Sequence, residues 1–392
     1  MRVAVVAEFY PRRSDPVLGV WAHRQALAAR DAGAEVHVLV LHRVVPPRRA
    51  LSAGPAAAAR ALSSLASQPT QDVIDGLPVR YVRYASPPRS RAYHRWGAWA
   101  GPALALALHR LRREFDFDLV HAHNAVPAGD AVRRARAHAP LVVSVHGGDV
   151  LHTVRRGEEA RRAVAAGLGA ARVVLANSVG IAQLAAQAGA RRTRVVHLGS
   201  DLPELSPTRS GPPTLVTVGH LVARKRHADV VRALAVLATR HPTLRYLVIG
   251  EGPEREAIAR LAERVGVADR VELVGQLEPQ AALARAREAT LFVMPSTDEA
   301  FGVAYIEAMA AGLPAIGCRG EPGPEEIAVA GDGMLLVPPG DVERLSQRID
   351  ELLSDPVRLR LTGRHARQTV SAHFSWERCG RETLDAYSAV LA

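Results

Sequence analysis

Short apolar runs rich in valine alternate with longer alanine-rich stretches of helical periodicity along the whole sequence. This alternation is typical of βαβ units, in which each strand is buried in a parallel sheet covered by helices. Since 392 residues exceed one typical domain, the pattern predicts an α/β chain of two domains. In the first half, strands are predicted at Arg2–Ala7, Glu35–Leu41, Val79–Tyr84, Leu119–His121, Leu141–Val145, Val173–Ala176 and Arg194–His197. In the second half, they are predicted at Thr214–Val218, Arg245–Ile249, Arg270–Val274, Leu291–Met294, Pro314–Gly317 and Met334–Val337.

The two sets of strands are separated by Leu202–Pro213, a stretch with four prolines and no periodicity that predicts a linker. We therefore expect an N-terminal domain over residues 1–205, a C-terminal domain over 206–375 and a terminal helix over 376–392. Within the first domain, Pro46–Gln71 is expected to form a mobile insertion. The apolar stretch Trp96–Arg113 fits either a buried helix starting at Pro102 or an interfacial membrane helix, and the strand that follows favours the buried helix.

Positive charge is concentrated in the first half of the chain. The 50 basic residues include a single lysine, Lys225, and the net charge is +11. Residues 1–210 carry a net charge of +14 and residues 211–392 a net charge of −3. A basic half indicates a polyanionic partner, namely nucleic acid, an anionic membrane surface or a phosphorylated acceptor. The absence of zinc-finger spacing and RNP motifs argues against nucleic acid.

Cysteine usage and the N-terminus favour a cytoplasmic protein. Cys318 and Cys379 have no metal-ligand spacing and cannot build a disulfide framework, as is typical of a reducing compartment. The first residues, MRVAVVAEFYP, predict a strand rather than a signal peptide, and no apolar run is long enough to span a membrane.

The most informative motif is PSTDEAFGVAYIEAMAAGLP, which starts at Pro295 directly after a predicted strand. Glu299 falls in the loop and a helix is predicted to begin near Gly302, which places Glu307 one to two turns inside it. Free amides at a helix N-terminus bind anions, and a glycine allows a phosphate to approach the backbone. Two carboxylates beside such a site suit sugar hydroxyls. Each alone could instead be a helix cap or a solvent-facing side chain.

A second motif, GHLVARKRH, begins at Gly219 after the strand TLVTV. A glycine turn followed by cations at a strand end can balance the charge that develops on a departing diphosphate. Lys225 is the best candidate for this role, with His220 and Arg224 beside it. Gly250, in GEGP after the next strand, marks another tight turn.

In the first half, the strand ending at Val145 runs into a turn that begins with His146. His121 and His123 lie at the end of the preceding strand, and with His146 they raise the alternative of a zinc site, although no acidic or cysteine ligand stands at metal spacing. Gly19 sits in the loop after the first strand, where a glycine lets the backbone approach a ligand.

Asp116 and Asp118 spell a DxD sequence of the kind that bridges a diphosphate through a divalent cation. The pair precedes a strand instead of following one, so we interpret it as turn chemistry and expect no metal requirement. P-loop, dinucleotide-binding and GxSxG motifs are missing from the sequence, which argues against those enzyme classes.

Taken together and in this order, from about residue 3 to 387, the motifs resemble the family 4 (group 1) glycosyltransferases, whose ExFGxxxxE signature matches Glu299 to Glu307. The sequence departs from the family pattern at His220, where arginine is usual, and at Arg226, where glycine is usual. The resemblance implies a GT-B fold, with two Rossmann-like domains facing a central cleft and the terminal helix crossing back to the N-terminal domain. It implies catalytic roles for His146, Lys225 and Glu299. It implies donor binding by Gly19, Gly219, His220, Arg224, Lys225, Gly250, Phe301, Gly302 and Glu307.

The activity implied is a retaining, metal-independent hexosyl transfer from a nucleotide-diphosphate sugar, which is a co-substrate, so that no cofactor is expected. The acceptor could be anionic or lipid-linked, as in surface polysaccharide or glycolipid synthesis, with peripheral contact of the basic domain on the inner face of the membrane. The alternatives are a nucleotide-sugar epimerase or phosphorylase on the same fold, a soluble small-molecule acceptor, and a non-catalytic binding protein.

Overall fold

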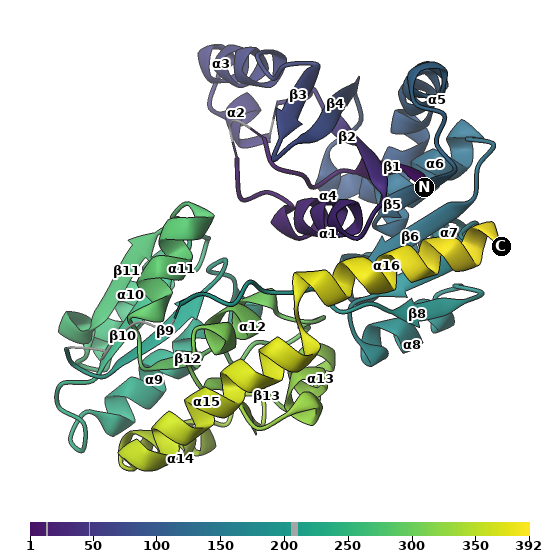
Figure 1. Ribbon diagram of the computed structural model, residues 1–392. Helices are drawn as coiled ribbons and strands as arrows, with labels where there is room; N and C mark the ends of the chain where they lie inside the picture. The colour runs from purple at the N-terminus through teal and green to yellow at the C-terminus, as the bar shows by residue number, and fades with distance from the viewer. Residues whose placement is uncertain (13–14, 47, 205–210) are drawn as a thin grey trace. The chain divides into compact units, whose positions relative to one another are not determined.

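A computed structural model describes residues 1–12, 15–46, 48–204 and 211–392, apart from the side chains of residues 48 and 49. The chain divides into two compact units, of which the first combines Met1–His197 with Trp376–Ala392 and the second is Leu198–Ser375 (Figure 1). Each unit is built around its own sheet. The predicted linker and the predicted boundary at 205/206 fall largely outside the described residues.

The N-terminal unit has an eight-stranded sheet in the order β3-β4-β2-β1-β5-β6-β7-β8, in which every neighbouring pair is parallel except β3 and β4. Its strands are β1 (Arg2–Ala7), β2 (Glu35–Arg43), β3 (Gln71–Ile74), β4 (Leu77–Tyr84), β5 (Leu119–His123), β6 (Leu141–Val145), β7 (Val173–Ala176) and β8 (Thr193–Val195). Its helices are α1 (Val20–Asp31), α2 (Arg48–Ser52), α3 (Pro55–Ala66), α4 (Arg89–Ala92), α5 (Trp96–Glu114), α6 (Asp130–Ala135), α7 (Glu158–Gly169), α8 (Val179–Gln187) and α16 (Trp376–Leu391).

The strand order of this sheet explains why helices cover both of its faces. From β1 the chain moves to β2 on one side, and after β4 it returns to β5 on the other side of β1. Because crossovers between parallel strands are right-handed, this change of direction places α1 and α5 on opposite faces. Helix α5 packs against α6, whereas the C-terminal α16 packs against α1.

The C-terminal unit has a six-stranded, all-parallel sheet in the order β11-β10-β9-β12-β13-β14. Its strands are β9 (Thr214–Val218), β10 (Arg245–Ile249), β11 (Val271–Gly275), β12 (Leu291–Val293), β13 (Ala315–Cys318) and β14 (Met334–Val337). Its helices are α9 (His227–Leu237), α10 (Arg255–Arg264), α11 (Pro279–Arg287), α12 (Val303–Ala310), α13 (Pro322–Ala330), α14 (Val342–Leu353) and α15 (Pro356–His373). Strands and helices share a core that includes Leu215, Val231, Tyr246 and Leu345.

All thirteen predicted strand segments coincide with strands of the structure, with ends that differ by a few residues. The edge strand β3, which pairs antiparallel with β4, was not predicted because its residues, QDVI, carry a weak apolar pattern. The segment Pro46–Gln71, which was expected to be a mobile insertion, contains the helices α2 and α3, which were not predicted.

The long helix α5 has one buried face and two exposed large side chains, Trp99 and Leu106. It packs on α6, as the buried-helix interpretation predicted, but it begins at Trp96 and contains Pro102 in its interior. Among the described residues, no helix is long and apolar enough to cross a membrane.

Helix α16 completes the N-terminal unit through close contacts with residues far away in the sequence. The Thr383 hydroxyl accepts a hydrogen bond from Gln25 at 3.3 Å, and the Tyr387 hydroxyl lies 2.7 Å from Nδ1 of His121. At Gly380, a Cβ atom would lie 2.1 Å from the carbonyl oxygen of Ala28, so α16 and α1 are in backbone contact there.

Replacing this glycine should separate the two helices. We expect Gly380→Ala to destabilise the protein by about 1–3 kcal/mol, the usual cost of overpacking, although alanine is the better helix former. Thermal denaturation measures the effect, and Ser388→Ala on the exposed face of α16 is the matched control. Equal melting temperatures for the two variants would contradict the close packing.

Candidate functional site

The topology of the C-terminal sheet brings two distant loops together. Strand β9 lies between β10 and β12, so the connections after β9 and after β12 leave in opposite directions from adjacent strand ends. In open parallel sheets, ligands bind at the carboxyl ends of strands where the order reverses in this way. Lys225 follows β9 and Glu299 follows β12, and the two side chains meet although 74 residues separate them.

Lys225 and Glu299 form a nearly buried ion pair. Nζ of Lys225 donates to Oε2 of Glu299 at 2.7 Å and lies 3.4 Å from Sδ of Met294. Only 11% of the lysine side chain and 10% of the glutamate side chain are exposed. The same carboxylate oxygen accepts from the Ser296 hydroxyl at 2.9 Å and lies 3.6 Å from Arg224. One carboxylate is therefore held by two cations and a hydroxyl.

These contacts decide the ionisation of Glu299. Burial alone would raise the pKa of its carboxyl group, but the charges of Lys225 and Arg224 and the hydrogen bonds from Lys225 and Ser296 outweigh burial and lower the pKa. The group is thus ionised at neutral pH. Two cations contact this one carboxylate, which suits an anionic ligand, and Glu321 adds a second acidic side chain nearby.

Glycines let the backbone of these loops come close together. Gly302 precedes α12 with φ +85°, and a Cβ atom there would lie 2.3 Å from the Tyr305 ring. At Gly250, with φ +146°, a Cβ atom would lie 2.1 Å from the carbonyl oxygen of Gly219. No side chain caps the start of α12, and the N–H of Tyr305 donates to the Gly302 carbonyl at 2.9 Å, which leaves the N–H groups of Val303 and Ala304 to a ligand.

The other predicted donor-binding residues of this unit occupy different environments. The Phe301 side chain is 1% exposed and packs edge-on against Phe374 with ring centroids 5.6 Å apart, so the ring belongs to the core. Glu307 is partly buried on α12. His220 is exposed, and its Nδ1 lies 3.2 Å from the carbonyl oxygen of Glu251.

Three polar side chains near the ion pair were missed by the sequence analysis. Ser296 bonds Glu299, and its hydroxyl lies 3.1 Å from the buried Tyr305 hydroxyl. Glu321, from the loop after β13, accepts from the backbone N–H of Glu299 at 2.9 Å. Ser296 stood inside the motif that begins at Pro295, whereas nothing in the local sequence distinguishes Glu321.

In the N-terminal unit, Gly19 and His146 lie beyond the carboxyl ends of β1 and β6. Gly19 has φ +68°, and a Cβ atom there would lie 2.2 Å from the backbone of Phe9, so the loop after β1 can close only around a glycine. The ring centroids of His146 and Trp21, at the start of α1, are 6.2 Å apart. Both residues belong to the N-terminal unit.

The side chains of His121, His123 and His146 lie in a row, with ring centroids 4.5 Å apart for His121 and His123 and 5.2 Å apart for His123 and His146. Nε2 of His121 lies 2.8 Å from the Ser144 hydroxyl, and Nδ1 of His123 lies 3.0 Å from Nε2 of His146. Burial lowers the pKa of His121 and of His146 to about 3 and that of His123 well below its usual value. The described residues contain no group of three or more His, Cys, Asp or Glu placed to hold a metal, so the zinc alternative finds no support in them.

The carboxylates of the N-terminal unit near these motifs hold backbone groups. Asp149 is buried and accepts from the N–H groups of Ala125 and Val126 at 2.8 and 3.3 Å, while burial raises its pKa to about 7. Asp118 accepts from the backbone N–H of Arg2 at 2.7 Å, at the start of β5. Asp118 therefore plays the structural part in a turn that the sequence analysis predicted for it.

Comparison with known proteins identifies the family of the chain. The model of the glycosyltransferase family 4 matches residues 18–204, and that of the glycosyl transferases group 1 matches residues 202–369. The chain belongs to the family 4 (group 1) glycosyltransferases. Over 175 residues, it is 31% identical to a GDP-mannose-dependent monoacylated alpha-(1-6)-phosphatidylinositol monomannoside mannosyltransferase of Corynebacterium glutamicum, covering 43% of this chain and 45% of that protein.

Solved structures confirm the GT-B fold of this glycosyltransferase. Sucrose-phosphate synthase of Thermosynechococcus elongatus matches with a TM-score of 0.79 and 21% identity, covering 100% of this chain and 99% of that one. Anabaena HepE, in complex with UDP, matches with a TM-score of 0.73 and 19% identity, covering 99% and 100%. The chain spans less than half the length of the first curated relatives it matches.

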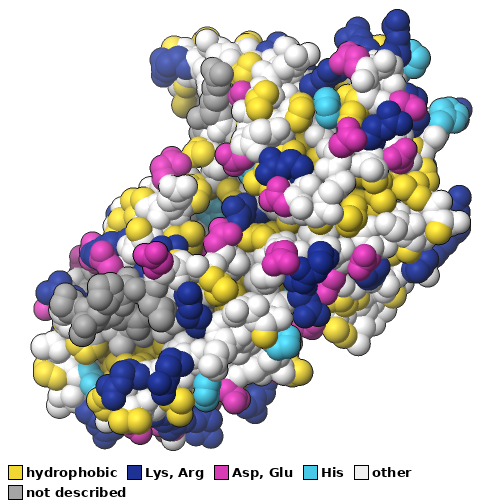
Figure 2. Space-filling view, viewed as in Figure 1, with side chains coloured by type: hydrophobic (Ala, Val, Ile, Leu, Met, Phe, Trp, Pro, Cys, Tyr) yellow, Lys and Arg dark blue, Asp and Glu magenta, His cyan; other side chains and the backbone are white. Residues whose placement is uncertain are grey.

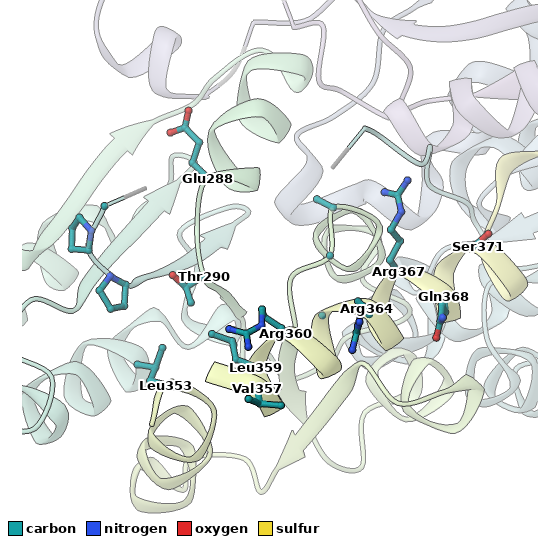
Figure 3. A pocket seen from close by; sticks show the side chains of 16 residues that line it. Glu288, Thr290, Leu353, Val357, Leu359, Arg360, Arg364, Arg367, Gln368 and Ser371 are labelled. Atoms are coloured by element: carbon teal, nitrogen blue, oxygen red, sulfur yellow. The ribbon is translucent and has the colours of Figure 1, made fainter. Parts of the chain in front are cut away.

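A cavity of about 1040 Å³ in the C-terminal unit of the glycosyltransferase does not coincide with the ion pair (Figure 3). It is lined by Thr290 and Pro213, which precede β12 and β9, and therefore lies at the amino ends of the strands. Arg360, Arg364 and Arg367 project from α15 around it. Since ligands of such sheets bind at the opposite edge, we place the site at the ion pair instead.

The row of histidines should make the glycosyltransferase sensitive to acid. The pKa values of these histidines in the folded protein lie below the ordinary value of 6.5. As the pH falls below 6.5, the unfolded chain therefore binds more protons than the folded chain. The contribution of these histidines to the stability of the fold is fully present above pH 6.5 and is lost as the pH falls towards 3. We expect the melting temperature to fall over this interval, and to fall less steeply in His146→Asn. His109→Asn, which removes an exposed histidine, should keep the wild-type slope.

Proposed function

We propose that this glycosyltransferase moves a hexosyl group from a nucleoside diphosphate sugar to an acceptor hydroxyl with retention at the anomeric carbon. The bond between the anomeric carbon and the diphosphate oxygen breaks, a bond to the acceptor oxygen forms on the same face, and the acceptor proton passes to the leaving diphosphate. The observation that carries the proposal is the Lys225–Glu299 pair, with Arg224 beside it, where the strand order of the sheet reverses.

Each donor-binding residue would have a distinct part. Lys225 and Arg224 would stabilise the negative charge that develops on the diphosphate, together with the free amides at the start of α12. Glu299, kept ionised by these cations, would accept hydrogen bonds from sugar hydroxyls, and Glu307 from the ribose. His146, neutral because it is buried, would contact the sugar without adding charge repulsion to an oxocarbenium-like transition state.

Three glycines and His220 would shape the diphosphate site. Gly19, Gly219 and Gly250 have no side chain and positive φ angles, so they would let the backbone approach the phosphates. His220 would donate to a phosphate oxygen in place of arginine. HepE, a structural relative, binds UDP on the same fold, which supports a nucleotide at this position.

The acceptor is proposed to be anionic or lipid-linked, and the reaction to serve surface polysaccharide or glycolipid synthesis. The net charge of +14 on residues 1–210 supports an anionic acceptor on the N-terminal unit. The C. glutamicum relative is named for a phosphatidylinositol monomannoside. A cytoplasmic enzyme in peripheral contact with the inner face of the membrane would meet such an acceptor.

Removing the cation next to the diphosphate should slow the chemical step. We expect Lys225→Ala to lower turnover by about 100-fold or more, the scale of losing a donor that stabilises transition-state charge. Release of nucleoside diphosphate from UDP-glucose or GDP-mannose measures turnover, and NMR of the product shows its anomeric configuration. Arg264→Ala, an exposed cation of the same unit, is the control. Wild-type turnover in Lys225→Ala would exclude the assigned role, and an inverted product would exclude retention.

We also propose that the reaction uses no metal cofactor, because two cations and helix amides already face the position assigned to the diphosphate. We expect the wild-type rate to survive EDTA treatment. Loss of turnover that is restored by Mg²⁺ or Mn²⁺ would contradict this proposal.

A further inference from the structure

A second pocket, in the N-terminal unit, combines apolar walls with arginines. It has a volume of about 750 Å³ and lies beyond the carboxyl ends of β2 and β4, on the same edge of the sheet as Gly19 and His146. Pockets of this size and position bind small ligands in α/β proteins. Its apolar wall consists of Val45, Pro46, Leu51, Pro88 and Trp96, and its basic residues are Arg43, Arg89 and Arg91.

Arg43 is a fixed part of this pocket. Its guanidinium donates to the Ser86 hydroxyl at 2.9 Å, to the Ser86 carbonyl at 2.8 Å and to the Val45 carbonyl at 3.0 Å. It also lies 5.0 Å from the centre of the Trp96 ring. Arg43 therefore contributes a positive charge of constant position, and three of its five N–H donors are used within the protein.

Arg89 and Arg91 differ from Arg43, because their donors are available. The guanidinium of Arg89 is held over the rings of Tyr93 and Phe9, at 4.4 and 5.0 Å from the ring centres. Aromatic faces attract a cation but accept no conventional hydrogen bond from its N–H groups. Among the described residues, neither the Arg89 nor the Arg91 side chain donates a hydrogen bond within 3.5 Å or forms an ion pair within 4.0 Å.

The charge around the pocket is not balanced by the protein. The buried Glu8, which accepts from the Tyr93 hydroxyl at 2.7 Å, feels the charges of Arg12, Arg43 and Arg89. Asp15 and Asp149 also interact with this group, at Arg12 and Glu8, but among the described residues neither forms an ion pair with an arginine that lines the pocket, so the pocket keeps a positive surplus. A phosphate group, which accepts charge-assisted hydrogen bonds from guanidinium groups, would complete the site.

The apolar wall continues onto an exposed helical surface. Leu51, which lines the pocket, belongs to α2 and is 52% exposed; the adjoining α3 buries none of its residues and exposes Leu62 to 49%. No acidic residue occurs between Glu35 and Asp72. Where Figure 1 places α2 and α3, Figure 2 shows hydrophobic and basic side chains exposed next to each other. Such a surface suits the acyl or prenyl chain of a lipid.

We propose that this pocket binds the phosphate of a lipid-linked acceptor through Arg89 and Arg91, with the lipid chain lying along Leu51 and α3. The identification of the bound lipid as the acceptor rests on the proposed function. The binding site itself is inferred from the pocket alone. A phosphate without a chain would leave the apolar wall uncovered, and a neutral chain would leave the two arginines without partners.

The test is calorimetric binding of dioctanoyl phosphatidic acid to the full chain, below the concentration at which this lipid forms micelles. We expect the double variant Arg89→Gln/Arg91→Gln to weaken binding by about tenfold or more, since hydrogen bonds between charged groups are lost. Leu51→Ser should weaken it by about threefold through loss of apolar contact. Inorganic phosphate lacks the acyl chains and dioctanoylglycerol lacks the phosphate. Each should bind far more weakly than the complete lipid.

The matched control is Arg191→Gln/Arg192→Gln, which removes the same charge from exposed positions just before β8, at the opposite edge of the sheet. It should bind the lipid as the wild type does. Equal weakening by both double variants would show general charge attraction and overturn the proposal, as would equal affinity for inorganic phosphate. Binding of UDP-glucose and GDP-mannose is measured on the same proteins. If neither donor binds while the arginine dependence holds, the lipid site stands and its assignment as the acceptor site falls.

Discussion

The pairing of β9 with β12 is the constraint on which the donor site depends. Because the chain leaves β9 towards β10 and only later returns to the other side of β9, two loops separated by about a fifth of the sequence end at neighbouring positions. Burying Lys225 and Glu299 together costs hydration for both, and each is tolerated only because the other is present. The strand order therefore determines where a charged pair can be buried, and the pair determines where an anion can bind.

The fold could be predicted from the sequence because it depends on periodicity. Valine-rich runs were sufficient to locate every strand of the two sheets except β3. Features that depend on tertiary contact were harder to predict. The antiparallel edge strand β3 has little apolar pattern of its own, and α3 forms without burying a side chain. Pro102 shows the limit of a local rule, since a proline that usually marks a helix start lies inside α5.

The candidate site was predicted in part. Motif spacing placed Lys225 and Glu299 on the loops that meet, and Gly302 at a helix start. It could not show that the Phe301 ring is part of the core, because that depends on packing against Phe374. Nor could it find Glu321, which reaches the backbone of Glu299 from another loop. The cation surplus at Arg89 was hidden for a similar reason, because 49 arginines make any single one inconspicuous in the sequence.

The position of α16 has a consequence for the order in which the chain can fold. The helix is synthesised after the whole of the second unit, yet it packs on α1, which is synthesised before that unit. The chain therefore passes from the first unit to the second and back again. During synthesis, the second unit has its complete sequence available before the first does. Until residues 376–392 have left the ribosome, the apolar face of α1 that α16 covers remains open, and the N-terminal unit needs protection from aggregation for that interval.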